Sequence, residues 1–540
     1  MKNRLNRRKF FGVSAGIAAL SCCRSEKPGE GTERQARINS FEFDEATIPE
    51  FQEGLESGRL TVRYITEKYL ERIAEIESGD RGLNSVIELN PEALEIAELL
   101  DKELKSKGPR GPMHGIPVLV KDNIGTSDRV TTTAGSLALA GSIPPEDSYV
   151  AAKLRQAGAV ILGKANLSEW ANFRSSKSTS GWSARGGQTH NPYARDRDPS
   201  GSSSGSAVAV AANLCSVAIG TETDGSIIGP SCVNCVVGLK PTVGLVGRSG
   251  IIPISHTQDT AGPMARTVTD AAILLSCLTG IDPKDAVTKQ SAGKSFSDYT
   301  RFLDPDGLQG ARIGVARKYF GFSEEVDRIM DDLIGEMKSW GAVIIDPVEI
   351  PRKGKIEEFK IMLYEFKDGI NKYLSGLGTA APVRSLAEII EFNERNREKE
   401  MPYFGQDIMI KAEEKGPLSS ADYKDALKNN LRFSRKEGLD AVMEEHQLDA
   451  VIAPSGGPPS LTDLVNGDHF VGGSCGAAAV AGYPNINVPA GFIFGLPFGI
   501  SFFGSAYSEP KLLKIAYAFE QATKIRRPPE FLETADLGLI

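Results

Sequence analysis

The sequence predicts an α/β fold, with a single domain built around a buried, largely parallel or mixed β-sheet. Short apolar runs alternate with amphipathic stretches along most of the 540 residues, which is the pattern of strands covered by helices. A hydrophobic content of 41% is enough for a large core and excludes a disordered chain. Because no internal repeat or long linker interrupts the pattern, we expect one domain over residues 40–535.

The N-terminal half shows the alternation most clearly. Thr61 is a good N-cap for residues 61–78, whose apolar side chains recur at helical spacing. Asn90-Pro91 begins a second helix that runs to about Lys105, because proline fits the first helical turn. Ligands of such folds bind beyond the carboxyl ends of the strands, so we expect the chemistry there. Further expected elements are strands over 116–120, 159–162 and 217–219 and helices over 149–156 and 207–213.

The segment from about 296 to 446 has a different, more charged character. We interpret it as a helical elaboration over the sheet. Together with residues near Trp170, it is expected to line the substrate pocket. The elements expected from here to the C-terminus are a strand over 310–316, a helix capped by Ser323, helical stretches over 353–374 and 419–446, a strand over 449–454 and a helix over 511–523.

Residues 1–22 have the order of a bacterial export signal. A basic start without acids is followed by an apolar run over 10–20, which is too short to span a bilayer. Arg7-Arg8 resembles a twin-arginine signal, and Ser21-Cys22-Cys23 resembles a lipoprotein box in which Cys22 or Cys23 carries the lipid. We therefore expect an exported protein, periplasmic or anchored outside the inner membrane, with a linker over 23–39. The alternative is the basic start of a cytosolic enzyme.

The charge balance and the scarce histidines exclude several classes of partner. The chain has 62 basic and 70 acidic residues and a net charge of −8, so a nucleic-acid partner is not expected. Its 5 histidines are not paired at metal-ligand spacing, and neither a metal nor a cofactor is expected. An odd number of cysteines in apolar stretches indicates small buried side chains rather than disulfides: Cys215, Cys232, Cys235, Cys277 and Cys475.

Two serine-bearing turns are the candidates for the chemistry. The loop over 199–206 precedes an apolar helix, and the turn over 220–230 follows the next apolar strand. Their glycines allow tight turns whose main-chain N–H groups point at an oxygen. A lysine at the end of a buried strand is a candidate base, but the residues alone do not choose among Lys121, Lys164 and Lys240.

At these turns the sequence resembles the amidase signature family of Ser–Ser–Lys hydrolases. The resemblance rests on GSSSGSA over 201–207 and GTETDGSI over 220–227, and on segments 114–123, 238–242 and 481–489 in the family's order. It extends from about Phe41 to Leu532, nearly the whole chain after the export signal. The resemblance implies a single α/β domain around a twisted mixed sheet.

The resemblance also implies a role for each residue of the site. Ser226 would be the nucleophile, Ser202 the bridging serine with a cis peptide to Ser203, and Lys121 the base. The oxyanion hole would consist of the main-chain N–H groups of Thr223, Asp224, Gly225 and Ser226. A serine needs an adjacent base, and a lysine serves only when burial lowers its pKa from about 10.4 toward 7–8. The implied reaction cleaves a carboxamide C–N bond through an acyl-enzyme, giving a carboxylate and ammonia or an amine.

Two positions depart from the commoner pattern of the family. Ile228 stands where an arginine is usual, and Ser204 stands where a glycine follows the serine pair. The run over 221–228, with segment 165–172 upstream, looks most like the bacterial peptide-amidase branch, whose members remove ammonia from C-terminal carboxamides of peptides. A small-molecule or peptide amide is therefore the expected substrate. Because this arginine is absent, the substrates of arginine-containing members of the family do not indicate the substrate of this chain.

Three other interpretations remain open at this stage. An α/β-hydrolase-type esterase would use Ser203 in the G-x-S-x-G run over 201–205, with a strand directly before it. It would also need a histidine such as His256, His446 or His469. The amidotransferase component that feeds ammonia to misacylated tRNA is opposed by the export signal, because tRNA and ATP are cytoplasmic. A non-enzymatic binding protein on the same fold is opposed by the complete set of serines and lysine.

Overall fold

The computed structural model describes residues 40–351, 354–378 and 381–538. The predicted export signal over 1–22 and the linker over 23–39 lie outside these residues, so both stay predictions. In the part that is described, no helix combines the length and the apolar character needed to cross a membrane. From Phe41 onward the chain forms one unit of contacts, which contains the sheet and all the helices given below.

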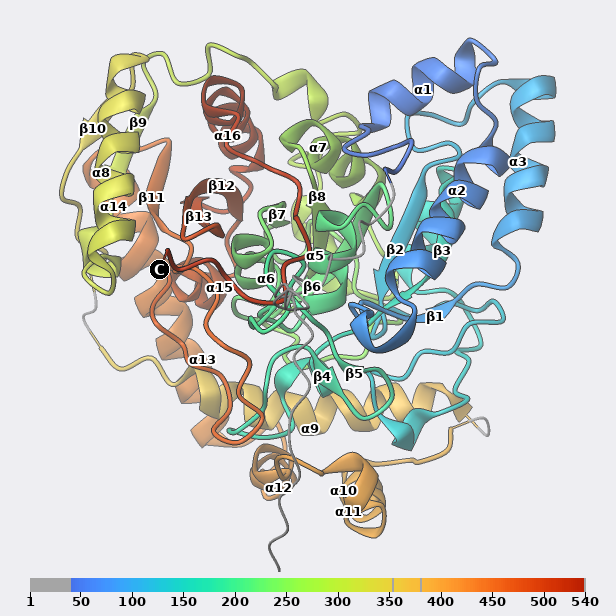
Figure 1. Cartoon of the computed structure of the whole chain (residues 1–540). Helices are drawn as coiled ribbons and strands as arrows, with labels where there is room; N and C mark the ends of the chain where they lie inside the picture. Colours follow the sequence, from blue (N-terminus) through green and yellow to red (C-terminus); the bar gives the residue numbers. More distant parts are fainter. Residues whose placement is uncertain (1–39, 352–353, 379–380, 539–540) are drawn as a thin grey trace, which may run out of the picture. The chain divides into compact units, whose positions relative to one another are not determined.

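An 11-stranded mixed sheet forms the centre of the described residues (Figure 1). Its order is β1-β3-β2-β6-β8-β7-β12-β13-β11-β9-β10, and a block of antiparallel pairs separates the parallel pairs β3-β2-β6 and β11-β9-β10. The predicted mixed sheet is confirmed. The strands are β1 (Val86–Leu89), β2 (Pro117–Lys121), β3 (Val160–Ala165), β6 (Val217–Glu222), β7 (Val237–Lys240), β8 (Thr260–Ala265), β9 (Arg312–Val315), β10 (Val343–Ile345), β11 (Ala450–Pro454), β12 (Asn485–Ile493) and β13 (Leu496–Phe503), with β4 (Trp182–Ser183) and β5 (Gly187–Gln188) as a separate pair.

The helices pack around this sheet, and α5 and α6 lie against its middle strands. All residues of α5 are buried, because a helix of alanine, valine and small polar side chains fits between strands and neighbouring helices. The α-helices are α1 (Ile48–Glu56), α2 (Val62–Ile76), α3 (Ala93–Lys107), α4 (Tyr149–Gln156), α5 (Ser204–Ala211), α6 (Ile228–Val233), α7 (Val268–Leu278), α8 (Glu324–Ser339), α9 (Glu358–Gly376), α10 (Leu386–Arg395), α11 (Arg397–Glu400), α12 (Asp407–Glu413), α13 (Ala421–Ser434), α14 (Asp440–Glu445), α15 (Cys475–Ala481) and α16 (Glu509–Thr523).

Helix starts follow the capping residues of the sequence. Thr61 caps α2 as predicted, because its side chain accepts a hydrogen bond from the Tyr64 N–H. The helix expected from Asn90-Pro91 begins later, at Ala93. The residues between them form a turn, in which the Asn90 side chain accepts a hydrogen bond from the Glu92 N–H at 3.0 Å.

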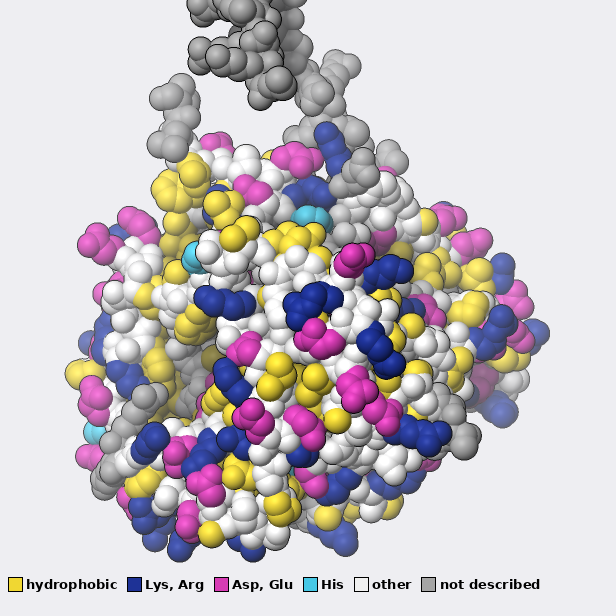
Figure 2. All heavy atoms as spheres, turned by 90° about the horizontal axis from the view of Figure 1, so that it is seen from below, with side chains coloured by type: hydrophobic (Ala, Val, Ile, Leu, Met, Phe, Trp, Pro, Cys, Tyr) yellow, Lys and Arg dark blue, Asp and Glu magenta, His cyan; other side chains and the backbone are white. Residues whose placement is uncertain are grey.

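The predicted helical elaboration over 296–446 is only partly helical. Its first portion contains the strand expected over 310–316, found as β9, and the helix capped by Ser323, found as α8. It also contains β10, which was not expected, and β9 and β10 form one edge of the sheet. Helices α9, α10 and α12 contact one another and surround a separate apolar cluster at the lower end of Figure 1. Figure 2 views the molecule from that end, and acidic and basic side chains are interspersed over this face.

Candidate active site

Lys121 is the last residue of β2, at the carboxyl end of this strand, and it is fully buried. Strands β2 and β6 run parallel, so their ends meet and bring Lys121 beside Thr221. The Lys121 Nζ donates hydrogen bonds to Ser202 Oγ at 2.7 Å and to Thr221 Oγ1 at 2.9 Å. It also lies 3.1 Å from Ser203 Oγ. The structure thus brings the lysine and the serine loop together, 81 residues apart in sequence.

Burial lowers the pKa of Lys121 to about 7, because the ammonium loses its hydration in the interior. The carboxylates of Asp259 and Glu222 oppose this shift and do not cancel it. A substantial fraction of the amine is therefore neutral at neutral pH and able to accept a proton.

The two other strand-end lysines are also buried but point elsewhere. Lys164 Nζ donates to the Ile124 carbonyl at 2.8 Å and to Thr132 Oγ1 at 2.6 Å, and burial lowers its pKa to about 8. Lys240 Nζ donates to the Pro241 carbonyl at 3.3 Å, and burial lowers its pKa as well. Neither amine contacts the serine loop. Of the three lysines that the residues alone left as candidates, only Lys121 lies beside the serines.

The serine loop differs in one detail from the implied arrangement. The cis peptide lies between Gly201 and Ser202, and the expectation of one between Ser202 and Ser203 is wrong. Ser203 already enters α5, where its carbonyl accepts the first helical hydrogen bond from Ala207, and a helical turn is built from trans peptides. Ser202 is fully buried, and its carbonyl accepts a hydrogen bond from the Ser168 N–H.

Ser226 lies in the turn between β6 and α6 and is 8% exposed. Its carbonyl accepts a hydrogen bond from the Ser203 N–H at 3.1 Å, which joins this turn to the serine loop. Within the described residues, the Ser226 hydroxyl makes no hydrogen bond. Gly225 has a φ of +78°, and a Cβ there would lie 3.1 Å from Cys475 Sγ, so this position favours glycine.

The turn leaves a set of main-chain donors without partners. In the part of the chain that the structure describes, the N–H groups of Thr223, Asp224, Gly225 and Ser226 donate no hydrogen bond. The next two, of Ile227 and Ile228, both donate to Glu222 Oε2, at 2.7 and 3.0 Å. Four adjacent free donors form a site for an oxygen that gains negative charge.

Sequence reasoning missed the side chains that hold this turn. Glu222 binds the main chain beyond the turn, and Thr223 Oγ1 donates to Asp259 Oδ1 at 2.5 Å. Thr221 contacts Lys121 and accepts a second hydrogen bond from Asn123 Nδ2 at 3.0 Å. All of these residues except Asp259 belong to the motif segments quoted above. Their positions in the sequence close to Lys121 and Ser226 were the signal that could have identified them.

The Ser203 hydroxyl makes structural hydrogen bonds and is not positioned as a nucleophile. Its hydroxyl donates to the Thr221 carbonyl at 3.0 Å and accepts from the Thr221 N–H at 3.1 Å. It is fully buried, and the loop before it contains no strand. The strand–turn–helix elbow that the esterase interpretation needs is therefore absent from residues 190–203.

Replacing Ser203 by alanine is expected to lower the free energy of unfolding by about 1–3 kcal/mol, because the buried Thr221 N–H loses its acceptor and the Thr221 carbonyl keeps only the longer hydrogen bond from Lys121 Nζ at 3.3 Å. Urea unfolding measures this loss. A fluorophosphonate probe should still label Ser226 in the variant. The esterase interpretation predicts the opposite result, with labelling at Ser203 in the unchanged protein and none in this variant.

The cysteines of the described residues form no disulfide. All five described cysteines are free, and Cys215, Cys232 and Cys235 are buried. Burial raises the pKa of these three thiols, which makes them poor nucleophiles. Across the described residues, no group of three or more His, Cys, Asp or Glu side chains is arranged to hold a metal ion.

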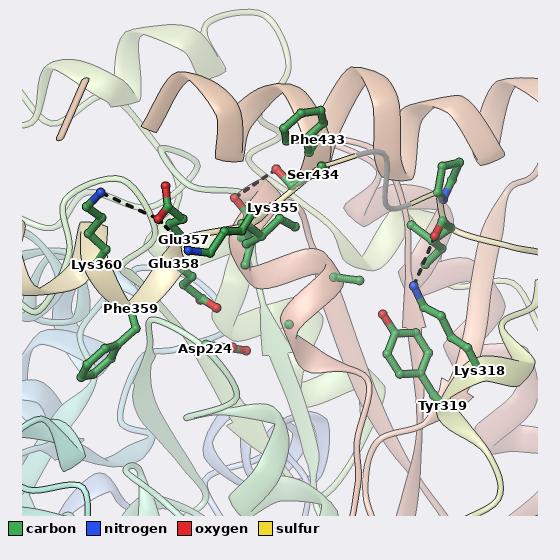
Figure 3. A pocket seen from close by; sticks show the side chains of 17 residues that line it. Asp224, Lys318, Tyr319, Lys355, Glu357, Glu358, Phe359, Lys360, Phe433 and Ser434 are labelled. Atoms are coloured by element: carbon green, nitrogen blue, oxygen red, sulfur yellow. Dashed lines mark hydrogen bonds and ion pairs between the residues drawn. The ribbon is translucent and has the colours of Figure 1, made fainter. Parts of the chain in front are cut away.

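Two cavities border the turn that carries Ser226. One, of about 790 Å³, has Asp224 and Glu358 in its wall and is drawn in Figure 3. The other, of about 510 Å³, is lined by Thr221 and Thr223 and also by Ala171, which is adjacent to Trp170. Both take residues from the segment over 296–446.

Comparison with known proteins agrees with this geometry. A family model described as Amidase matches residues 64–513. A probable amidase of Arabidopsis thaliana is 43% identical over 97% of this chain and 99% of its own length. The X-ray structure of native peptide amidase from Stenotrophomonas maltophilia has a TM-score of 0.86 and 49% identity, over 91% of this chain and 100% of that one. A glutamyl-tRNA(Gln) amidotransferase component from Thermoanaerobacter pseudethanolicus is 34% identical over 91% of this chain and 99% of its own length.

Proposed function

The chain belongs to the amidase family and hydrolyses amide C–N bonds, and from this premise we propose that its substrates are peptides with a C-terminal carboxamide, from which it releases ammonia. The similarity to a peptide amidase over nearly the whole chain supports this substrate class. So does a cavity of about 790 Å³ beside the turn, which has room for amino-acid residues on the acyl side of the scissile bond.

The observation that carries the proposed mechanism is the 2.7 Å hydrogen bond between Lys121 and Ser202 beside the turn of free donors. Ser226 Oγ attacks the carbonyl carbon of the carboxamide and gives its proton to Ser202, which passes its own proton to the neutral Lys121 amine. Serine suits the relay because its hydroxyl both donates and accepts. The carbonyl oxygen becomes an oxyanion and accepts hydrogen bonds from the main-chain N–H groups over 223–226.

Collapse of this tetrahedral intermediate breaks the C–N bond. The Lys121 ammonium returns its proton through Ser202 to the departing nitrogen, which leaves as ammonia. Ser226 then carries the acyl group as an ester. Water attacks the ester by the same relay, its proton passing to Ser202 and its oxygen to the acyl carbon, and the peptide leaves with a free carboxylate while Ser226 regains its proton.

Ammonia release across a matched panel tests the substrate class. We expect N-acetyl-dipeptide amides to be hydrolysed with a kcat/KM at least about tenfold above that of propionamide or benzamide, because the cavity beside the turn contributes binding only to the longer acyl group. The corresponding internal peptide bonds should stay intact. Equal rates for all amides would overturn the proposal, as would ammonia release from glutamine alone, the outcome expected of an amidotransferase.

A further inference from the structure

Asp224 belongs to two features of the site at once. Its main-chain N–H is one of the free donors of the turn, and its side chain lines the larger cavity. Figure 3 shows the carboxyl groups of Asp224 and Glu358 next to one another in the wall of this cavity. Of the acidic residues that line the cavity, Asp224 is the only one that belongs to the turn.

One oxygen of the Asp224 carboxyl lacks a hydrogen-bond partner, whereas the neighbouring Glu358 has one. Asp224 Oδ1 is buried and has no hydrogen-bond partner of normal geometry in the described residues, with the Cys475 thiol and the Glu358 carboxyl as the nearest side chains that could share a proton with this carboxyl. Glu358 Oε1, by contrast, accepts from Gln258 Nε2 at 2.7 Å, and the same amide donates to the Thr223 carbonyl at 3.3 Å. An acceptor left open at the edge of a cavity can accept a hydrogen bond from a ligand bound there.

Space for such a donor is present beside Asp224. The residue across from it is Gly476, where a Cβ would lie 3.5 Å from Asp224 Oδ2. A glycine at this place leaves the carboxyl uncovered toward the cavity that both residues line. The rest of the wall includes apolar and aromatic side chains, such as Phe359 and Phe433, which suit the remainder of a peptide.

The charge state of Asp224 is compatible with accepting a hydrogen bond. Burial and the neighbouring Glu358 raise the pKa of Asp224 well above its usual value, and burial raises the pKa of Glu358. A carboxyl keeps an acceptor oxygen whether it is ionised or neutral, so an N–H donor can bind it in either state.

Covalent geometry identifies which N–H that is. In a peptide amide, the α-nitrogen of the last residue is two bonds from the carbonyl carbon that Ser226 attacks. Asp224 carries both a donor for the carbonyl oxygen and the open carboxyl, so this α-N–H is the substrate donor nearest to the atoms that the turn binds. Building on the proposed substrate class, we propose that the Asp224 carboxyl accepts the α-N–H of the residue whose carboxamide is cleaved.

This contact makes Asp224 a specificity-determining residue. It would favour amides that carry a hydrogen-bonded nitrogen at the α-position over amides that lack one. It would also place the carbonyl carbon next to Ser226, because one residue then holds both the oxyanion and the adjacent nitrogen. Simple alkyl and aryl amides would forgo this contact.

The test compares two substrates that differ in a single atom: N-acetyl-alaninamide and its ester analogue O-acetyl-lactamide, which has oxygen in place of the α-N–H. Ammonia release gives kcat/KM for both, and their ratio is the readout. In the unchanged protein we expect a ratio of about 5 to 100 in favour of the amide, because a buried acceptor left without its donor costs about 1–3 kcal/mol. Asp224→Ala should bring the ratio close to 1, and Asp224→Asn should leave an intermediate value.

Glu357→Ala is the matched control, because Glu357 lines the same cavity but forms an ion pair with Lys355. It should keep the ratio of the unchanged protein, and circular dichroism and fluorophosphonate labelling establish that each variant is folded with a reactive Ser226. An unchanged ratio in folded Asp224→Ala and Asp224→Asn would overturn the inference alone. Failure of the unchanged protein to hydrolyse N-acetyl-alaninamide or longer peptide amides would instead overturn the proposed substrate class.

Discussion

Replacement of Ser226 by alanine is expected to lower kcat for amide hydrolysis by about 10⁴- to 10⁶-fold, the largest effect of any single side chain in the site. The variant keeps the turn and its free N–H donors, so substrate still binds, but no covalent acyl-enzyme forms. Ammonia assays cover this range of kcat, with short reaction times for the unchanged protein and overnight incubation for the variant. Mass spectrometry with a fluorophosphonate probe should place the label on Ser226 in the unchanged protein and find none in the variant.

Ser206→Ala is the matched control for this variant. Ser206 is another buried serine close by, but its hydroxyl donates to the Ile219 carbonyl at 3.1 Å, away from Lys121. We expect its kcat to stay within about a few-fold of the unchanged protein, because only a structural hydrogen bond is lost. Hydrolysis that persists in folded Ser226→Ala would contradict the mechanism.

Replacement of Lys121 by methionine is expected to lower kcat/KM by about 10²- to 10⁴-fold, the contribution of a positioned general base. Methionine fills a similar volume without the amine, so Ser202 has no acceptor for its proton. In the unchanged protein the pKa of Lys121 is about 7, and the neutral amine is the active form. The rate should therefore fall about tenfold per pH unit below pH 7 and level off above it.

Lys164→Met provides the control, since Lys164 is as fully buried and has its pKa lowered to about 8 by the same cause. Its amine contacts Ile124 and Thr132, so the variant should keep the acid limb near pH 7. Two results would contradict Lys121 as the base. One is that the fall of the rate below pH 7 disappears in Lys164→Met, and the other is that Lys121→Met keeps both high activity and this fall.

Lys121 also affects how the free energy of unfolding depends on pH. Between pH 7 and about 10.4 the unfolded chain holds a proton on Lys121 that the folded chain lacks, so stability rises with pH over this window. Lys121→Met removes that dependence. The difference in unfolding free energy between the two proteins should shift in favour of the unchanged protein by up to about 1.4 kcal/mol per pH unit, which urea unfolding at pH 7 and 9 measures.

Local sequence patterns predicted the elements that depend on neighbours along the chain. Helix α4 has the predicted bounds, and Thr61 caps α2 as expected, because capping and periodicity act within a few residues. Helix α3 begins later than predicted, after a turn in which the Asn90 side chain accepts a hydrogen bond from the Glu92 N–H. The segment over 296–446 was harder, because membership of β9 and β10 in the sheet depends on distant strand β11.

The sequence by itself determined the residue types of the site and their order: two serine turns around one buried helix and strand, and lysines at the ends of apolar strands. Tertiary structure decided which lysine meets the serines, because parallel pairing of β2 with β6 sets Lys121 beside Thr221 while Lys164 and Lys240 face other carbonyls. It also decided the protonation of that amine and the open carboxyl of Asp224, since burial and facing charges come from segments far apart in the chain.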